Sequence, residues 1–456
     1  MESQVLTIIL AAGKGTRMKS GLAKVLHPVA GKPMISHVIN SASPISSSVV
    51  VIVGYQGDKV KETLGTGYTY VRQEEQLGTG HAVLQAKKLI KKHQGQVLIL
   101  CGDTPLLREK TLSELVDAQR ETGAGVAVLT ADIDNPRGYG RIIRNEAGNQ
   151  IIKIVEDSDA SDEERLVNEI NSGVYCFDSN QLSEALENLT NDNAQGEYYL
   201  TDTIAYLRNK GEVVVPVKVD DSREIIGVND RRNLARAERV LRNRIINYHL
   251  ANGVSIIDPD TTYIDSTVEI GQDSVIYPFT YIEGRTRIGS EVVVGPHSHL
   301  INAEIGDRSK LLDSTVIKDS KIGEDTNIGP FAYIRPGCQI ASGVKVGDFV
   351  ELKKAKIGEN TKVPHLSYVG DAEIGENSNI GAGTIFANYD GKKKHKTKVG
   401  NNAFIGSNTT LIAPVTVGNR GKTGAGAVVT KDVPGGVTVV GVPARKFKKD
   451  NIEGDK

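Results

Sequence analysis

Hydrophobic and polar positions follow two different periods along this chain of 456 residues. Up to about residue 229, short apolar runs alternate with polar segments whose apolar residues recur at helical spacing. Candidate strands are 5–10, 48–54, 96–101 and 125–130, and candidate helices include 80–93 and 110–122. Strands that alternate with helices predict a doubly wound, parallel, Rossmann-like α/β sheet that binds ligands outside the carboxyl ends of its strands.

Residues 230–250 contain neither Gly nor Pro and place apolar side chains at helical spacing behind Asp230, a candidate N-cap. We expect one helix of about 30 Å here, since each residue adds about 1.5 Å. This linker helix joins a first domain, residues 1–229, to a second domain, residues 251–456. Its six arginines are typical of a solvated face rather than of a nucleic-acid site.

Beyond residue 251 the apolar period becomes six. Ile or Val stands before Gly at positions such as 270, 288 and 294, and separations of 6, 12 and 18 dominate. This pattern is the hexapeptide repeat, in which six residues form one flat face, three faces form a coil and the aliphatic residue points inward. The length of this part predicts about ten coils.

Composition argues against several classes of protein. The net charge of −1 supplies no field that would attract nucleic acid or an acidic membrane. The cysteines, Cys101, Cys176 and Cys338, are far apart in sequence, which argues against a disulfide framework and a zinc site. No apolar run reaches about 18 residues, and the chain begins without a signal-peptide pattern. We therefore expect a soluble, cytoplasmic protein with no nucleic-acid or membrane partner.

The stretch LAAGKGTRM, residues 10–18, followed by Lys24, comes directly after the first candidate strand. Glycines there let backbone N–H groups approach an anion, and a helix that begins nearby would add its positive dipole end. The spacing fits neither a Walker A loop nor a dinucleotide-binding fingerprint. A glycine-rich turn without a ligand is the alternative. The stretch resembles the signature of the sugar-1-phosphate nucleotidyltransferases.

Further candidate site residues follow at candidate strand ends and in loops, namely Gln73, Gly78, Thr79, Asp103, Gly140, Glu156, Asn171 and Asn229. Each is a weak signal by itself, because a lone Asp is more often a cap and an Asn before Gly is more often a hairpin residue. Their order resembles the uridyltransferase half of the bifunctional enzymes that make UDP-N-acetylglucosamine. Those enzymes usually have an aromatic residue where this chain has Cys101, which puts in doubt only a backbone or packing contact.

This resemblance implies a role for each residue. Leu10, Ala11, Ala12, Gly13 and Lys24 would hold phosphate and nucleotide, Gln73, Gly78 and Thr79 would read uracil, Gly140, Glu156 and Asn171 would hold the sugar, and Asp103 and Asn229 would bind Mg²⁺ beside the nucleotide. The sugar-1-phosphate oxygen would attack the α-phosphorus of UTP in line, with pyrophosphate as the leaving group. Arg17 and Lys24 would neutralise the developing charge, so that catalysis is mostly positioning and electrostatics. A solvated surface charge is the alternative for Arg17.

Three clusters decorate the hexapeptide repeat, namely Lys353-Lys354, His365 and Asn388-Tyr389. Acetylation of an amine requires removal of a proton, and histidine, with a reference pKa of about 6.5, suits that task at neutral pH. The basic residues Arg335, Lys353 and 392–394 suit an anionic substrate or the phosphates of coenzyme A. A purely structural or regulatory solenoid is the alternative.

These clusters resemble the acetyltransferase half of the same enzymes, which implies a left-handed parallel β-helix that forms a homotrimer with sites between neighbouring coils. Arg335, Lys353, Tyr368 and Asn379 would bind glucosamine-1-phosphate, His365 would be the base, and Ala382, Asn388, Tyr389, Ser407 and Ala425 would line the acetyl-CoA site. The family often has an arginine in an irregular tail, whereas this chain ends its repeats with VGVPAR, the ending of generic hexapeptide acyltransferases. We expect Arg445 to replace that contact to coenzyme A.

Together these signals predict a two-step enzyme. Acetyl-CoA acetylates glucosamine-1-phosphate in the second domain, and UTP then converts N-acetylglucosamine-1-phosphate to UDP-N-acetylglucosamine, a precursor of peptidoglycan and other parts of the cell envelope. One alternative is a single-activity nucleotidyltransferase whose β-helix oligomerises or senses effectors, and His365 with Asn388 and Tyr389 argues against it. The other is a non-catalytic subunit of a translation-initiation exchange factor, which would be expected to lose the glycine-rich loop that this chain keeps.

Overall fold

The computed structural model describes residues 4–193 and 195–447, and the chain divides into two compact units, residues 1–241 and 242–456. The border falls inside α8 (Arg231–Ala251), the helix that the sequence predicts at 230–250. Its cap is as expected, because the Asp230 carboxylate accepts the backbone N–H of Asn233 at 2.8 Å. Of the helices in the described part of the chain, none combines the length and apolar character that a membrane span needs.

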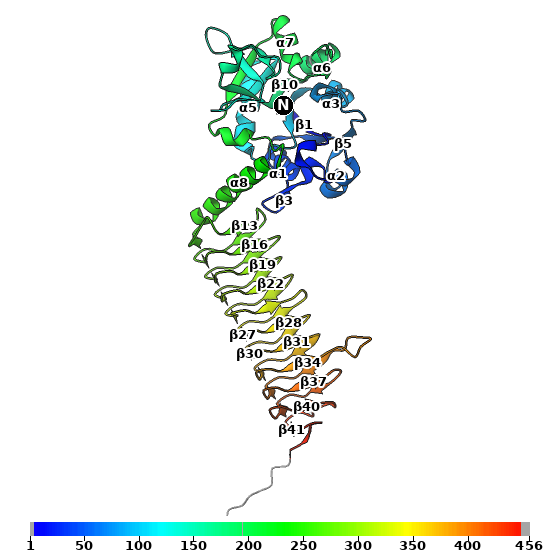
Figure 1. The fold of residues 1–456 in the computed structure, drawn as a ribbon, viewed down its shortest axis with the longest axis vertical. Coiled ribbons are helices and arrows are strands. Elements are labelled where there is room, and N and C mark those ends of the chain that lie inside the picture. Colours follow the sequence, from blue (N-terminus) through cyan, green and yellow to red (C-terminus); the bar gives the residue numbers. More distant parts are fainter. Residues whose placement is uncertain (1–3, 194, 448–456) are drawn as a thin grey trace, which may run out of the picture. The chain divides into compact units, whose positions relative to one another are not determined.

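The first unit is a twisted sheet with helices on both faces (Figure 1). Its strands stand in the order β11 (Val214–Lys218), β7 (Val126–Asp132), β10 (Glu169–Asp178), β6 (Gly95–Cys101), β1 (Gln4–Ala11), β4 (Ser48–Val53) and β5 (Thr69–Arg72). All neighbours are parallel except β10, which runs antiparallel to both β6 and β7. The prediction of a purely parallel sheet is wrong for this strand. The chain returns from β7 through the hairpin of β8 (Arg141–Arg144) and β9 (Ile151–Val155) instead of a crossover helix, so it can pair antiparallel.

Successive side chains of each strand point to opposite faces of the sheet, so the apolar side chains of this unit form two cores. Ile9 belongs to the core that α1 (Met34–Ala42), α2 (Gly57–Leu64) and α5 (Glu109–Thr122) cover. Ile8 belongs to the core that α3 (Thr79–Leu84), α4 (Lys87–Lys92), α6 (Ser179–Glu187) and α7 (Asp202–Asn209) cover. The predicted helix 80–93 is therefore two helices, α3 and α4. The doubly wound α/β arrangement is confirmed.

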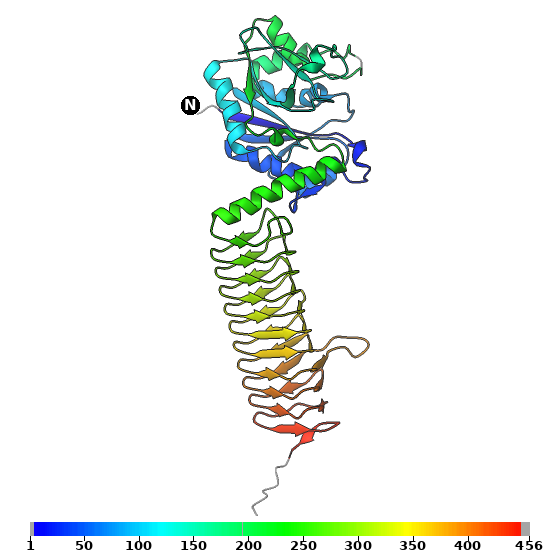
Figure 2. The same ribbon diagram turned by 60° about the vertical axis from the view of Figure 1, so that its left-hand side comes forward.

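The second unit is a left-handed parallel β-helix (Figure 2). In the described part of this unit its short strands stack in three columns of twelve, ten and nine, with the last strand of the first column antiparallel to its neighbour, in agreement with the expected number of coils. The first, second and third columns begin with β12 (Ser255–Ile256), β13 (Tyr263–Ile264) and β14 (Glu269–Ile270) and end with β42 (Arg445–Lys446), β40 (Val428–Val429) and β38 (Thr416–Val417). Aliphatic residues such as Ile282, Leu300 and Ile317 stack in register from coil to coil and are fully buried. The inward aliphatic position of the repeat thus forms the core.

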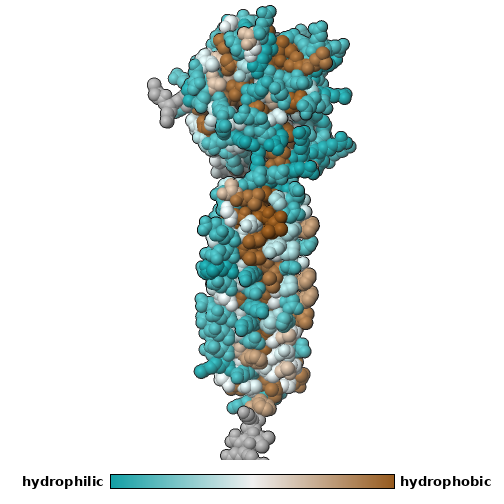
Figure 3. Space-filling model, turned by 90° about the vertical axis from the view of Figure 1, so that its left-hand side faces the viewer, coloured by the Kyte–Doolittle hydropathy of each residue, from teal (hydrophilic) through white to brown (hydrophobic). Residues whose placement is uncertain are grey.

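The corner between the first and second columns bears exposed apolar side chains. Phe331 and Phe349 stack with ring centroids 5.2 Å apart, and Leu366 occupies the same corner one coil further on. All three backbones are left-handed, with φ of 55°, 54° and 51°. Hydrophobic residues also gather on one face of the coils in Figure 3. Exposed apolar surface of this kind is typical of a contact between proteins.

Candidate active sites

A cavity of about 270 Å³ lies at the carboxyl ends of β1 and β6 in the first unit. Nine residues predicted for the nucleotide and metal sites line it, namely Leu10, Ala11, Ala12, Gly13, Lys24, Gln73, Gly78, Thr79 and Asp103. Val25, Gln76, Ala82, Cys101 and Glu197 line it as well. This edge is where ligands of doubly wound sheets bind, so the cavity is the candidate nucleotide site.

The loop predicted to read uracil is held by a segment from much later in the chain. Gly80 donates its backbone N–H to the Tyr198 carbonyl at 2.8 Å, and Tyr198 donates its own to the Leu77 carbonyl at 2.8 Å. A Cβ at Gly78 would lie 2.6 Å from the Tyr198 carbonyl oxygen, so this close approach requires glycine. The same pairing brings Glu197 to the cavity. Sequence reasoning missed Glu197, because no local pattern reveals a pairing between such distant segments.

Lys24 and Asp103 line this cavity, and Asn229 contacts Lys24. The Lys24 ammonium forms a short ion pair with Asp103 and donates to Asn229 Oδ1 at 3.0 Å. The loop that bears Asn229 is fixed by the Asp103 carbonyl, which accepts the Val228 N–H at 2.9 Å. The Asp103 carboxylate and the Asn229 side-chain oxygen thus face a positive charge, that of Lys24. Hard oxygen ligands of this kind suit Mg²⁺, which takes few protein ligands. Among the described residues there is no group of three or more His, Cys, Asp or Glu side chains suited to a metal ion.

The three residues predicted to hold the sugar form one cluster at the base of the β8–β9 hairpin. Gly140 precedes β8 and Glu156 follows β9, and these ends of the two strands lie side by side. Asn171 lies on β10 beside a β-bulge and donates its backbone N–H to the Gly140 carbonyl at 2.8 Å. It is therefore not the hairpin residue of the alternative interpretation. Burial raises the pKa of Glu156, whose carboxylate accepts the Thr201 hydroxyl at 3.2 Å.

Cys101 links the nucleotide cavity to the bulge near the sugar cluster. It lines the cavity, and its thiol contacts the Gly173 carbonyl at 3.6 Å. Burial raises the pKa of this thiol to about 12, so it is uncharged at neutral pH. Cys101 therefore supplies an uncharged packing contact at the position where the uridyltransferases that this chain resembles usually have an aromatic residue.

Arg17 is absent from the cavity lining, whereas Lys24 is part of it. Arg17 is exposed on η1 (Thr16–Met18), a single turn of 3₁₀ helix, and Lys24 begins a second such turn, η2 (Lys24–Leu26). The expectation that a helix adds its dipole to the glycine-rich loop is wrong, because one turn aligns too few peptide dipoles.

In the second unit, His365 pairs with a carboxylate on the neighbouring coil. His365 ends β30 (Lys362–His365), Asp348 ends β27 (Lys345–Asp348), and the register sets the two residues opposite each other. His365 Nδ1 and Asp348 Oδ1 form a short hydrogen bond, which lowers the pKa of Asp348. Because Nδ1 is engaged, Nε2 is the ring nitrogen available to a substrate. The motif analysis missed Asp348, although it lies about one coil before His365.

Basic residues lie on the second column, across the corner from His365. Arg335 follows β25 (Tyr333–Ile334) and donates to Glu351 at 2.8 Å, and Lys353 ends β28 (Glu351–Lys353). Lys353 lies near Lys394 of the lysine-rich loop, and the proximity of its ammonium group lowers the pKa of Lys394. Two adjoining ammonium groups form a site for an anion such as a phosphate.

The amide and hydroxyl groups predicted for the acetyl site flank the same corner. Asn388 follows β34 (Ile385–Ala387), and its Nδ2 donates to Asp371 at 2.6 Å and to the Tyr368 hydroxyl at 3.4 Å. Tyr368 begins β31 (Tyr368–Gly370) on the second column. Asn379 begins β33 (Asn379–Ile380) on the first column and is paired with Lys362 of the strand that His365 ends.

Three residues predicted to contact acetyl-CoA form a line from coil to coil. Ala382, Ser407 and Ala425 follow β33, β36 (Phe404–Ile405) and β39 (Lys422–Thr423). Backbone N–H groups of the next coils donate to the carbonyls of Ala382 and Ser407 at 2.7 and 2.8 Å. The line begins at His365, whose carbonyl accepts the Gly383 N–H at 3.2 Å. An extended ligand along this line would therefore reach His365 at one end.

The remaining two predicted contacts to acetyl-CoA are exposed. Tyr389 lies in the loop between β34 and β35 (Thr397–Val399), where it forms a bridge with Lys394. Arg445 lies on β42, which pairs with β41 (Thr438–Val440) at the end of the first column beyond Ala425.

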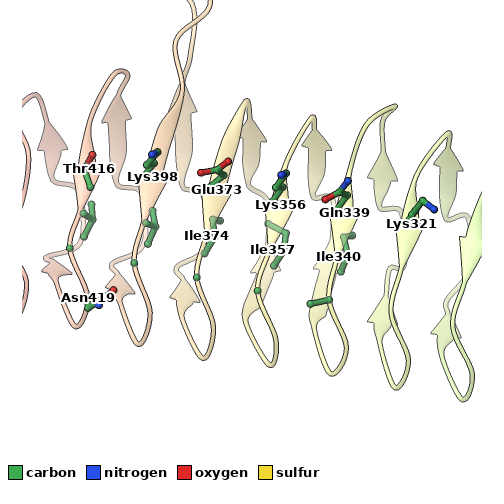
Figure 4. Close-up of a pocket in the computed structure, with 17 residues that line it drawn as sticks. Lys321, Gln339, Ile340, Lys356, Ile357, Glu373, Ile374, Lys398, Thr416 and Asn419 are labelled. Carbon is green, nitrogen blue, oxygen red and sulfur yellow. The ribbon is translucent and has the colours of Figure 1, made fainter.

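A different groove, of about 950 Å³, runs along the third column (Figure 4). Polar side chains of successive strands border it, namely Lys321, Gln339, Lys356, Glu373, Lys398 and Thr416. It contains none of the residues predicted for acetyl transfer. The candidate acetyl site is therefore identified by the chemistry of its side chains, because the larger groove of this unit lies elsewhere.

Comparisons with known proteins agree with this organisation. Residues 6–225 match the nucleotidyl transferase family, and residues 267–302, 319–354, 354–388 and 396–431 match the bacterial transferase hexapeptide family. The chain is 50% identical over 431 residues to the bifunctional protein GlmU of Acetivibrio thermocellus, a match that covers 94% of this chain and 93% of that protein. It is 51% identical to GlmU of Brevibacillus brevis, covering 95% and 94%, and 49% identical to GlmU of Geobacillus thermodenitrificans, covering 97% and 96%.

Proposed function

The chain belongs to the family of the bifunctional protein GlmU, and from this membership we propose which residues of each unit perform the two reactions. It is an enzyme of UDP-N-acetylglucosamine synthesis with two activities. One transfers the acetyl group of acetyl-CoA to glucosamine-1-phosphate, and the other transfers uridylate from UTP to N-acetylglucosamine-1-phosphate and releases pyrophosphate. The product supplies peptidoglycan and other cell-envelope polymers.

Uridyl transfer is assigned to the cavity of the first unit. The residues 10–13 hold the triphosphate, Gln73, Gly78 and Thr79 receive the uracil, and Gly140, Glu156 and Asn171 hold the sugar. The sugar phosphate oxygen attacks the α-phosphorus of UTP, and the bond from that phosphorus to the pyrophosphate oxygen breaks. Lys24 neutralises charge on the reacting phosphates, and Arg17, which is outside the cavity lining, neutralises charge on the leaving pyrophosphate.

Asp103 and Asn229 are the residues that would hold Mg²⁺ in this site. The ion, when bound, supplies further neutralisation of phosphate charge. The convergence of both oxygens on the Lys24 ammonium supports this assignment, because it marks a point where the protein stabilises positive charge.

Acetyl transfer is assigned to the corner at His365. As the amine of glucosamine-1-phosphate attacks the thioester carbonyl, Nε2 of His365 accepts a proton from the nitrogen, the C–S bond breaks and coenzyme A leaves as a thiolate. Asp348 orients the ring through Nδ1 and stabilises the imidazolium. Arg335, Lys353, Tyr368 and Asn379, joined by Lys394, bind glucosamine-1-phosphate, and Ala382, Asn388, Tyr389, Ser407, Ala425 and Arg445 line the acetyl-CoA site.

The observation that supports this division most directly is that predicted residues form two separate clusters, one in each unit. The test measures coenzyme A release with glucosamine-1-phosphate and pyrophosphate release with UTP and N-acetylglucosamine-1-phosphate on one preparation. We expect both activities, and we expect EDTA to abolish only pyrophosphate release. A preparation that releases pyrophosphate but no coenzyme A would instead support the single-activity alternative.

We further propose that the second unit assembles into a homotrimer. The exposed corner of Phe331, Phe349 and Leu366 next to His365 supports a contact between subunits close to the acetyl site. Because the enzyme consumes UTP and acetyl-CoA, we place it in the cytoplasm.

A further inference from the structure

The segment that bears Lys24 folds back on the start of α8. Met18, Val29 and Met34 of residues 18–34 are fully buried in a small core with Ala237 of α8. Lys24 is part of this segment, so the packing of residues 18–34 against α8 bears directly on where its ammonium lies.

A strained hairpin in this segment depends on one side chain of α8. The strands β2 (Pro28–Val29) and β3 (Lys32–Pro33) are joined by Ala30 and Gly31, with φ of 43° and 80°. A left-handed backbone is disfavoured for alanine, and the N–H of the buried Ala30 needs an acceptor. Glu238 supplies it, because its Oε2 accepts this N–H at 2.8 Å.

The hairpin and Lys24 are joined by a short segment that a backbone hydrogen bond holds in place. His27, which directly precedes β2, donates its backbone N–H to the Lys24 carbonyl at 3.2 Å. The imidazole of His27 also contacts the Arg231 guanidinium at 3.4 Å, at the first residue of α8. Asn229 lies two residues before the same helix. The helix α8 therefore fixes the positions of both Lys24 and Asn229, which contact each other.

We propose that Glu238 is a positioning residue for uridyl transfer, which holds the hairpin of residues 28–33 on α8 and thereby fixes Lys24 beside Asp103 and Asn229. The inference rests on the proposed role of Lys24 in that reaction. Glu238 acts through the backbone of Ala30 and has no part in the chemistry itself.

The test compares variants of the full-length chain in both assays. Glu238→Ala should lower the kcat of uridyl transfer roughly 10–100-fold, because a small displacement of a charged group at the reacting phosphates has that effect. The KM for UTP should change less than kcat, since Lys24 binds the nucleotide but acts most strongly on the charge that develops in the transition state, and the KM for the sugar phosphate should stay close to that of the wild type. Acetyl transfer in the same preparation should be unchanged and serves as the standard for enzyme concentration, and a circular dichroism spectrum that matches the wild type reports that the first unit is folded.

Two substitutions separate positioning from general stability. Glu238→Gln keeps an oxygen acceptor and should retain most of the activity, and Arg239→Ala, at an exposed position on the same helix, is the matched control. Adding Ala30→Gly to Glu238→Ala should restore part of kcat, because glycine adopts the left-handed turn without strain. Should Glu238→Ala unfold the first unit, Glu238→Asp, which shortens the reach by one methylene, replaces it and must show the same loss.

Lys24→Ala is measured in parallel. A wild-type kcat in Glu238→Ala beside an inactive Lys24→Ala would overturn the inference and leave the proposed function intact. A wild-type rate in Lys24→Ala would refute the role of Lys24 itself. Equal loss in Glu238→Ala and Glu238→Gln, without rescue by Ala30→Gly, would also contradict a positioning role.

Discussion

In the first unit the partners of Lys24 come from positions 79 and 205 residues away in sequence, whereas in the second unit Asp348 is only 17 residues from His365. A doubly wound sheet brings distant loops together at one edge, so its site depends on the packing of the whole unit. A solenoid converts a separation of one coil into direct contact, so the part of the site that one chain supplies depends on neighbouring coils. Damage should therefore spread further in the first unit than in the second.

Truncation tests this contrast with the largest expected effect. A piece of residues 1–241 keeps the α8 residues that pack on segment 18–34, whereas a piece of residues 1–230 keeps Asn229 but loses that packing and Glu238. We expect the longer piece to retain uridyl transfer and the shorter one to lose it roughly 100-fold or more. Equal activity of the two pieces, measured by pyrophosphate release, would contradict the dependence of this site on α8.

The cut also releases the second unit. Residues 242–456 contain their own core and should remain trimeric and active in acetyl transfer. Light scattering and the coenzyme A assay measure both properties. A monomeric piece with full acetyl transfer would contradict a site that depends on neighbouring subunits.

His365→Ala tests the local site of the second unit. Loss of the base should slow acetyl transfer roughly 10²–10⁴-fold, while uridyl transfer continues. The coenzyme A and pyrophosphate assays on one preparation measure the two effects. Acetylation at the wild-type rate would make His365 an ordinary surface histidine.

Asp103→Asn is the counterpart in the first unit. The change removes the charge that pairs with Lys24 and would hold Mg²⁺, so uridyl transfer should fall roughly 10²–10³-fold, as when a group that stabilises transition-state charge is lost. Acetyl transfer should persist. A circular dichroism spectrum that matches the wild type excludes misfolding of the first unit, and loss of both activities in a folded variant would contradict the separation of the two sites.

Asp348→Asn should have the smallest effect, because it leaves the base in place. Loss of the carboxylate that orients His365 should lower the kcat of acetyl transfer roughly 10–100-fold, in line with other carboxylate–histidine pairs. The hydrogen bond from His365 lowers the pKa of Asp348, so the wild-type contact is present above the usual Asp range and weakens only as the pH falls through the lowered pKa. A full pH–rate profile checks both statements, and a wild-type profile for the variant would exclude an orienting role.

Local patterns in the sequence were sufficient for much of this protein. The glycine-rich stretch 10–18 with Lys24 predicted a nucleotide site, and nine of the residues predicted for the nucleotide and metal sites line one cavity of the first unit. The six-residue period predicted stacked coils and their number, and the resemblance to hexapeptide acyltransferases implied the left-handed β-helix. Both patterns can be recognised in the sequence because a turn suited to phosphate and a coil that must bury one residue in six impose their requirements on consecutive residues.

Other features required the tertiary structure. The antiparallel course of β10, the reach of Glu197 into the cavity and the bond from Ala30 to Glu238 each join segments that no local period relates. The Asp348–His365 pair is an intermediate case, because its spacing equals one coil but only the register shows which residues face each other. Sequence alone determines what each short segment can do, since propensity and periodicity act over a few residues. Long-range packing decides which segments meet, since that choice depends on the free energy of the whole folded unit.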